Sequence, residues 1–531
     1  MSVHLSEEIA GRPERVTVET KFGPVIGGWA RNGAIAFLEI PYALPPLRFE
    51  NPKPLPSGYR YENKEYIYES SFACQPLKDG QAAGVPVKDK VGLGKPTENP
   101  LFLNIVVPSK FTISKQGSKF PVKVYIHGGF LQFGSPHGVG AQAQFVAEER
   151  HEIYVNIGYR LSAFGFLACS EPKVEGNFGF RDQWLALEWI KDNISSFGGD
   201  ADDIQITGLS AGAHSVHQIL HHVSHLPAGK KSPFRSAVLQ SNAIVLSPKT
   251  REELKPQFDA LCKALNIDHT SSEALSILKD PVKTPWQLIT NAIDSESLGI
   301  FGTFRGCLDG EWLESEPMEW QRSGEFAAGL RRAGVQSIVV GDLSEEWYLY
   351  AIAHPIKYAV DVRSNLLRYY PEDRVDALLS CYPRLPEDAK PEDCFQLFGK
   401  VLSDGQVHLP VRILARDLTA SGFPVLRYEI RWTPEASRKH VKGYVTHATD
   451  RVLWCYREPS LSEYEKKIAK EWLVKVDEET KKLEQEPAKD IDQVLTLRED
   501  QSIGWDRDRR YEEVMRLVPA VSSAEWVHSK Y

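Results

Sequence analysis

The segment Gly208-Leu209-Ser210-Ala211-Gly212 is the most informative stretch of this chain of 531 residues. It is a Gly-x-Ser-x-Gly motif, which is typical of a strained strand-to-helix turn that exposes a serine nucleophile. Residues 203–207 before it predict a short strand, and residues 211–223 after it predict a helix with one apolar stripe. Glycines flank the serine because a side chain would clash where the chain reverses. An ordinary turn in which Ser210 only caps the helix is the alternative.

A longer pattern leads into this motif. From Asn177 the chain reads Asn-Phe-Gly-Phe-Arg-Asp-Gln-Trp-Leu-Ala-Leu-Glu-Trp-Ile-Lys-Asp-Asn-Ile-Ser-Ser-Phe-Gly-Gly-Asp. Together with the motif at Ser210, this stretch resembles the type-B carboxylesterase and cholinesterase family of the α/β-hydrolase superfamily. The resemblance covers nearly the whole chain. It implies an α/β-hydrolase fold, in which helices flank a central, mostly parallel sheet and helical cap insertions lie beside the site.

No feature of the sequence divides the chain into domains. We find no Gly/Ser-rich or Pro-rich linker and no internal repeat, so we expect residues 1–531 to form a single domain. Residues 249–330 and 360–420 are mainly helical in pattern and are expected to be insertions near the site. Residues 460–486 predict a long, charged helix on a solvated flank.

The segment His127-Gly128-Gly129-Phe130 follows a strand that is predicted at residues 122–126. It resembles the family's His-Gly-Gly-Gly oxyanion loop, with Phe130 in place of the third glycine. The resemblance implies that backbone N–H groups of Gly129, Phe130 and Ala211 stabilise the oxyanion of the reaction. A Gly-rich loop with no catalytic role is the alternative.

Three acidic residues follow the strand predicted at residues 337–341, namely Asp342, Glu345 and Glu346. One of them is expected to hold the base that activates the serine. Their segment resembles the family's Gly-x-Asn-x-Asp-Glu-Gly sequence, whose last acid is catalytic. This resemblance selects Glu346 and leaves Asp342 in reserve. Ser241 matches a family serine that supports the catalytic acid.

Two histidines, His440 and His447, follow the strand predicted at residues 425–431. A histidine is the base that takes the serine proton in such triads. Spacing does not separate the two candidates. Residues 443–448 resemble the histidine loop of the family, which selects His447. His440 lies among basic residues, which favours a solvated side chain.

Five further histidines lie on the helix predicted at residues 211–223 or just after it. His217 and His221 have the i, i+4 spacing that can hold zinc. No carboxylate or cysteine accompanies them to complete a site, so we expect no metal and a partly solvated helix face. The five histidines are His214, His217, His221, His222 and His225.

The composition disfavours several kinds of protein. The net charge of −8 is no reason to expect nucleic-acid binding. No run of about 18 apolar residues occurs, so no membrane span is expected. The N-terminal segment lacks the basic start and apolar run of a secretory signal. Family members that are secreted pair a cysteine near Cys74 with one at the position of Pro100, so we expect a cytoplasmic protein with free thiols.

These features predict a serine carboxylic-ester hydrolase that acts on a small-molecule ester through an acyl-enzyme on Ser210. The expected triad is Ser210, Glu346 and His447, and no cofactor is implied. Two alternatives stay open. One is a non-catalytic binding protein on the same fold, and the other is an acyltransferase that uses the same triad. The sequence leaves the acyl and alcohol preference and the oligomeric state open.

Overall fold

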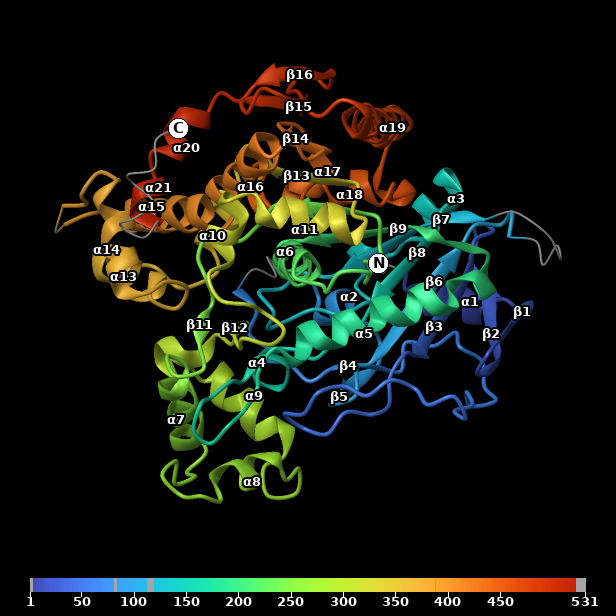
Figure 1. Ribbon diagram of the computed structural model, residues 1–531, viewed down its shortest axis with the longest axis horizontal. Coiled ribbons are helices and arrows are strands. Elements are labelled where there is room, and N and C mark those ends of the chain that lie inside the picture. The colour runs from blue at the N-terminus through green and yellow to red at the C-terminus, as the bar shows by residue number, and fades with distance from the viewer. Residues whose placement is uncertain (1–2, 81–83, 112–118, 387, 522–531) are drawn as a thin grey trace.

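A twelve-stranded sheet forms the centre of the protein in a computed structural model that describes residues 3–80, 84–111, 119–386 and 388–521 (Figure 1). Its strands, in spatial order, are β1 (Arg15–Thr20), β2 (Gly23–Trp29), β3 (Ile35–Pro41), β6 (Phe102–Val107), β8 (Ile153–Ile157), β7 (Phe120–Ile126), β9 (Gly199–Leu209), β10 (Ser236–Gln240), β13 (Ser337–Leu343), β14 (Val425–Ile430), β15 (Gln493–Leu497) and β16 (Ile503–Arg507).

The middle of the sheet is parallel. Strands β8, β7, β9, β10, β13, β14 and β15 pair parallel with their neighbours. The pairs at the two edges, such as β1 with β2 and β15 with β16, are antiparallel. Because parallel strands end at the same edge of a sheet, the loops that follow them meet there, which is where open α/β sheets bind ligands.

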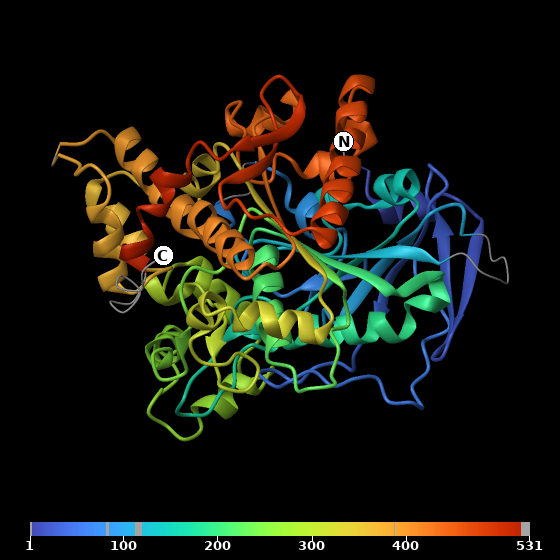
Figure 2. The same ribbon diagram turned by 45° about the horizontal axis from the view of Figure 1, so that its top comes forward.

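Helices cover both faces of this sheet. Helices α5 (Phe178–Asn193) and α6 (Ala211–Ser224) lie against one face, and α3 (Gln144–Arg150) and α19 (Glu463–Gln485) lie against the other. Figure 2 shows the orange-red α19 and the green α5 on opposite sides of the strands. A sheet that is covered in this way is buried on both faces, which explains the nearly continuous apolar runs of its central strands.

Each face of the sheet has its own hydrophobic core. Val339 and Val340 are neighbours on β13, yet they belong to different cores because side chains alternate along a strand. The core on the α19 side includes Trp472, which is fully buried. The prediction of a long, charged helix on a solvated flank therefore holds only in part. One stripe of α19 is buried against the sheet, most of its other side chains are exposed, and its start is capped by Ser462.

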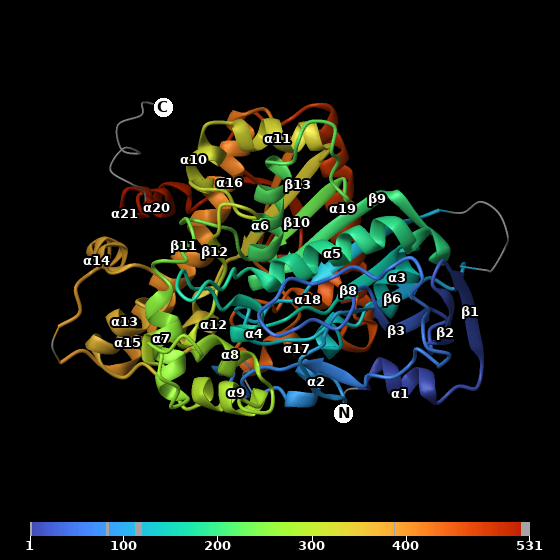
Figure 3. The same ribbon diagram turned by 60° about the horizontal axis from the view of Figure 1, so that its bottom comes forward.

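The remaining helices fill the connections between strands. Helices α7 to α9 and α13 to α15 form two groups beside the carboxyl ends of the strands (Figure 3). Their bounds are α1 (Leu5–Ala10), α2 (Val87–Val91), α4 (Ser162–Phe166), α7 (Lys255–Ala264), α8 (Ala274–Lys279), α9 (Trp286–Asp294), α10 (Pro317–Arg322), α11 (Glu325–Ala333), α12 (Trp347–Ala351), α13 (Ala359–Leu366), α14 (Glu372–Ser380), α15 (Pro391–Ser403), α16 (Leu409–Ala420), α17 (Glu435–Arg438), α18 (Arg451–Trp454), α20 (Tyr511–Met515) and α21 (Val518–Val521). Two small sheets pair β4 (Ser71–Ala73) with β5 (Lys95–Thr97) and β11 (Lys249–Thr250) with β12 (Cys307–Leu308).

Candidate active site

Ser210 occupies the sharp turn between β9 and α6. Its backbone has φ 60° and ψ −127°, a conformation that is rare for a residue with a side chain and is found at functional sites. The Ser210 N–H donates to the carbonyl of Gln240 at 2.9 Å, and its own carbonyl accepts from the N–H of His214 at 3.0 Å. The neighbouring strand and the first turn of α6 therefore hold the strained serine in place.

The two glycines of the motif are required by close backbone contacts. A Cβ atom on Gly208 would lie 2.2 Å from the carbonyl carbon of Gly212. A Cβ atom on Gly212 would lie 2.0 Å from the carbonyl oxygen of Ile126, the last residue of β7. Contacts this short exclude any side chain. The glycines thus allow α6 to begin directly against the ends of β7 and β9.

The loop after β7 lies against Ser210. A Cβ atom on Gly128 would be 2.9 Å from the Cβ atom of Ser210, so the two residues are in direct contact. Gly129 and Phe130 have φ values of 111° and 56°. The N–H groups of Gln132 and Phe133 donate to the Gly129 carbonyl at 2.8 and 2.9 Å, which fixes the loop.

The residues predicted as oxyanion donors, Gly129, Phe130 and Ala211, have free backbone N–H groups beside Ser210. The N–H groups of Gly129 and Phe130 have no hydrogen-bond partner within the described ranges. Ala211 is the first residue of α6, where a helix provides no carbonyl for the N–H. The Phe130 side chain points away from this loop toward Tyr350 and Tyr369, with ring centroids 6.1 and 5.7 Å away.

Glu346 and His447 form a buried pair at the same edge of the sheet. Oε2 of Glu346 lies 2.7 Å from Nδ1 of His447, and their exposed fractions are 0% and 4%. Oε1 of Glu346 accepts the N–H of Leu343 at 3.0 Å, which orients the carboxylate. Nε2 of His447 is buried and has no hydrogen-bond partner among the residues that the structure describes. This nitrogen is therefore available to a reacting group.

The structure brings the serine and histidine segments together, although no hydrogen bond joins the two side chains in the described part of the chain. Leu209 and Ala448, the neighbours of Ser210 and His447, pack in one small apolar cluster. Hydrogen bonds between a catalytic serine and its base are often long before substrate binds.

The other acidic candidates have different partners. Asp342 contacts Arg427 at 2.6 Å, Arg412 at 2.8 Å and His408 at 2.7 Å in a buried cluster. Burial alone would raise the pKa of Asp342, but the charges of Arg427 and Arg412 outweigh it and hold this pKa well below its usual range. Glu345 accepts the N–H of Val445 at 2.8 Å. Neither acid contacts His447 within the described ranges.

Two further predicted positions differ in their surroundings. His440 is exposed, as its basic neighbours indicated. Ser241 is buried with a positive φ of 54°, and its N–H donates to the carbonyl of Gly341 at 2.9 Å. Its hydroxyl has no hydrogen-bond partner among the described residues, Glu346 included. The supporting role of Ser241 stays a prediction.

Sequence reasoning missed two buried neighbours of the pair. The ring of Tyr350 lies edge-on to the imidazole of His447, with centroids 5.2 Å apart. Asp450 is fully buried and accepts the indole N–H of Trp454 at 2.8 Å. Burial, followed by the negative charge of Glu346, raises the pKa of Asp450 to about 6. Its position three residues after His447 was the signal that could have identified it.

The histidines of α6 are mostly packed rather than solvated, so this expectation was wrong. His217 and His221 are buried, and their rings lie against Phe326 of α11. His222 stacks on Trp312, and His225 stacks on the ring of Trp320. Among the described residues, no group of three or more His, Cys, Asp or Glu side chains could hold a metal ion.

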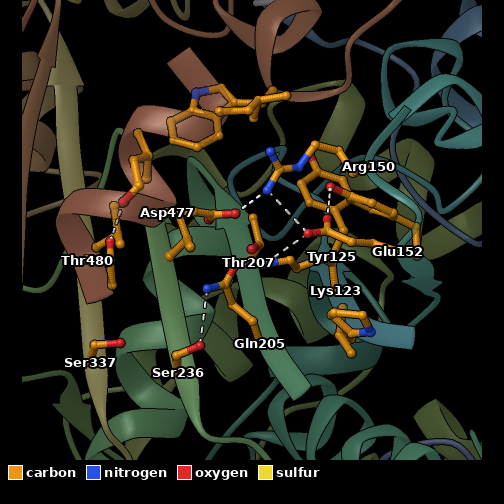
Figure 4. Close-up of a pocket in the computed structure, with 18 of the residues that line it drawn as sticks. Lys123, Tyr125, Arg150, Glu152, Gln205, Thr207, Ser236, Ser337, Asp477 and Thr480 are labelled. Atoms are coloured by element: carbon orange, nitrogen blue, oxygen red, sulfur yellow. Dashed lines mark hydrogen bonds and ion pairs between the residues drawn. The ribbon is translucent and has the colours of Figure 1, made fainter. Parts of the chain in front are cut away.

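Two of the cavities lie on opposite faces of the sheet. One, of about 130 Å³, lies beside α6 and is lined by His214, Arg305 and residues from both helical groups. The other, of about 170 Å³, lies between the sheet and α19 (Figure 4). Several of its charged side chains pair with one another, as Arg150 does with Asp477. This second cavity is separated from α6 and Ser210 by the sheet.

Two further features are the state of the cysteines and the character of the helices. All seven cysteines are free, and six of them are buried, Cys74 included. Within the described ranges, none of the helices combines the length and the apolar character needed to span a bilayer.

Comparisons with known proteins agree with this architecture. A profile of the carboxylesterase family matches residues 14–477. A Schizosaccharomyces pombe protein that is named an uncharacterized esterase/lipase is 32% identical over 510 residues, which are 88% of this chain and 90% of that protein. A carboxylic ester hydrolase of Gibberella moniliformis is 30% identical over 467 residues, which are 82% of each chain.

A solved structure provides the comparison for the fold. A PNB esterase aligns with a TM-score of 0.71 at 22% identity, and the alignment covers 94% of this chain and 99% of that one. This match confirms the predicted α/β-hydrolase fold. The chain belongs to the carboxylesterase family and is a carboxylic ester hydrolase.

Proposed function

We propose that the protein hydrolyses small-molecule esters with a triad of Ser210, His447 and Glu346. The observation that carries this proposal is the buried 2.7 Å contact between Glu346 and His447, at the sheet edge where Ser210 occupies a strained turn. The carboxylate of Glu346 favours the tautomer of His447 with a proton on Nδ1. Nε2 is then free to accept the serine proton.

In the first half of the reaction, Oγ of Ser210 attacks the ester carbonyl carbon while Nε2 of His447 takes the hydroxyl proton. Negative charge then develops on the carbonyl oxygen, and the N–H groups of Gly129, Phe130 and Ala211 stabilise it. His447 returns the proton to the departing alcohol as the carbon–oxygen bond breaks. The acyl group is left on Ser210.

In the second half, water attacks the acyl-enzyme while His447 takes one of its protons. The same N–H groups stabilise the second oxyanion. Ser210 leaves with the proton from His447, and the carboxylic acid is released. Glu346 stays ionised throughout and stabilises the imidazolium that forms twice in each cycle. The two unpartnered N–H groups in the loop after β7 support this assignment of the oxyanion donors.

A fluorophosphonate probe tests the proposal. We expect one adduct per chain, located on Ser210 by peptide mass analysis and absent from Ser210→Ala. The absence of an adduct in the folded wild-type protein would favour a non-catalytic binding protein. Product analysis with added alcohols distinguishes the other alternative, because an acyltransferase would form a new ester where a hydrolase forms the free acid.

We also propose that the protein works in the cytoplasm. The free state of all seven cysteines supports a reducing compartment, in which disulfides rarely persist.

A further inference from the structure

A cation without a carboxylate partner lines the cavity beside α6. Arg305 is partly exposed, and it forms no ion pair within the described part of the chain. Its two terminal nitrogens are each 3.4 Å from one acceptor, Oε1 of Gln406. Hydrogen bonds of N–H to oxygen are usually shorter, and a guanidinium carries five N–H donors. Most of the hydrogen-bonding capacity of Arg305 is therefore unused.

The other charged groups that face the cavity leave it basic. Its charged lining consists of Arg305, Lys249, Arg368 and Glu253. Arg368 pairs with Glu296 at 3.3 Å, and Glu253 accepts the N–H of Thr250 at 2.8 Å. Glu253 keeps its charge, but within the described ranges it forms no ion pair with Arg305, and the lining holds three cationic side chains against this one carboxylate. Burial, the largest effect, lowers the pKa of Arg305, which remains a cation near neutral pH.

The cavity is close to the reacting groups. His214 lines it and follows Ser210 by one turn of α6, which is about 5.4 Å along the helix axis. Tyr369 also lines it, and its ring contacts that of Phe130. Phe130 contacts Tyr350, which in turn lies against His447. A series of ring contacts therefore leads from the cavity that holds Arg305 to the triad.

The neighbours of Arg305 are arranged to hold it in place. Nε2 of Gln406 donates to the hydroxyl of Tyr370 at 2.8 Å, so its carbonyl oxygen is directed at the guanidinium. Burial and the charge of Arg305 hold the pKa of His214 well below its usual range, so this imidazole is neutral. The guanidinium of Arg305 is thus bordered by two neutral polar side chains, Gln406 and His214.

We propose that Arg305 binds a carboxylate group of the ester substrate, and that the enzyme prefers esters that carry a second, anionic group a few bonds from the reacting carbonyl. The proposal rests on the proposed function. A planar carboxylate can accept two parallel hydrogen bonds from one guanidinium. Because the charge is partly buried and unpaired, a matching anion compensates its desolvation, whereas an apolar chain would leave it unpaired.

The test compares esters that carry a carboxylate with neutral esters that lack it. Mono-4-nitrophenyl glutarate carries a carboxylate on the acyl side, and 4-nitrophenyl pentanoate is its neutral counterpart. On the alcohol side, 4-acetoxybenzoate is compared with phenyl acetate. The readout is the ratio of kcat/KM for the charged ester to that for the neutral ester, in wild type, Arg305→Gln and Arg305→Lys. Active-site titration with the fluorophosphonate gives the concentration of folded enzyme.

We expect Arg305→Gln to lower this ratio about tenfold or more for one pair of esters, mainly through KM. Arg305→Lys should restore part of it, because the charge returns without the planar fork. Arg368→Gln is the matched control and should keep the wild-type ratio, since its charge already has a partner. The affected pair shows whether the carboxylate belongs to the acyl or the alcohol side.

An unchanged ratio in Arg305→Gln for both pairs would overturn the proposal, as would an equal fall in Arg368→Gln. Failure of the proposed function looks different. In that case the folded wild-type protein would hydrolyse neither the neutral nor the charged esters and would form no adduct on Ser210.

Discussion

The carboxylate of Glu346 lies 2.7 Å from Nδ1 of His447, and both side chains are buried, whereas Asp342 is turned toward three basic groups in the core. The two acids are only four positions apart in the sequence. β13 ends at Leu343 and the chain turns immediately after it, which directs Glu346 to the histidine loop. Glu346 is therefore the candidate catalytic acid, and Asp342 is an acid whose ion pairs stabilise the core.

The first prediction concerns the triad. Ser210→Ala, His447→Ala and Glu346→Ala should each lower the turnover of 4-nitrophenyl acetate by about 10³-fold or more. Their effects should not add in the double variants, because the residues act as a unit. Steady-state rates, corrected for folded protein, measure this. Near-full activity of Glu346→Ala would show that another group holds His447.

The second prediction concerns Asp342. Replacing it by alanine should lower stability rather than chemistry, because Arg427 and Arg412 would be left buried without their partner. Breaking such a buried ion pair costs about 3–5 kcal/mol in free energy of unfolding. Urea unfolding measures the loss, and the rate per folded molecule should stay within about threefold of wild type. A stable but inactive Asp342→Ala would make Asp342 the catalytic acid.

The third prediction concerns the pH dependence of stability. Burial and the charge of Glu346 raise the pKa of Asp450 to about 6 from 3.8. The folded state therefore holds this proton more tightly than the unfolded chain does. The stability gained from this tighter proton binding by Asp450 is fully present below about pH 4 and is lost as the pH rises through about 6. It amounts to about 3 kcal/mol in free energy of unfolding.

The Asp450→Asn variant isolates this contribution, because asparagine keeps an acceptor for Trp454 and does not ionise. The difference in unfolding free energy between wild type and variant should shift in favour of the variant as the pH rises from 4 to 7. Urea unfolding at several pH values measures it. A difference that stays constant over this range would show that Asp450 titrates normally.

The fourth prediction concerns Phe130. Its φ of 56° is one that glycine adopts without strain, so Phe130→Gly should keep the N–H donor in place. Loss of the ring removes its contacts with the rings of Tyr350 and Tyr369. Rates on bulky 4-nitrophenyl esters should rise relative to those on the acetate. If both rates fall by about 100-fold, the magnitude of a lost oxyanion donor, the ring is needed to hold the loop.

The fifth prediction concerns the thiols. Titration of the denatured, unreduced protein should find close to seven reactive thiols, because all seven cysteines are free in the folded structure. The native protein should react more slowly, since burial raises the pKa of Cys74 and lowers its thiolate fraction. A count of one thiol would indicate three disulfides and contradict the cytoplasmic assignment.

Local features were predictable from the sequence because they depend on neighbours in the chain. The turn at Ser210 needs glycines on both sides, and the close contacts of Gly208 and Gly212 show why. The family resemblance implied the mostly parallel sheet. The resemblance to the family then selected Glu346 and His447, which spacing alone did not separate from Asp342 and His440. The division into one domain with two helical insertions stays a prediction.

Features that depend on distant partners were not predictable in this way. The histidines of α6 have polar side chains, and only the packing of α11 against them shows that His217 and His221 are buried. Because α19 carries many charged residues, its buried stripe, which includes Trp472, was not recognised in the sequence. The strands β15 and β16 were not predicted, and their pairing with β14 and with each other is visible only in the folded chain.

The strand-to-helix turn at Ser210, the loop after β7 and the chain order of serine, acid and histidine were predictable from the sequence. The turn and the loop depend on backbone conformation and on residues close together in the chain. The contact of Glu346, and not of Asp342, with His447 is explained by the folded chain, because the core binds Asp342 with charges from α16 and β14. The absence of a carboxylate partner for Arg305 among the described residues was likewise not predictable from the sequence. Burial and ion pairing depend on residues about a hundred positions apart in the chain.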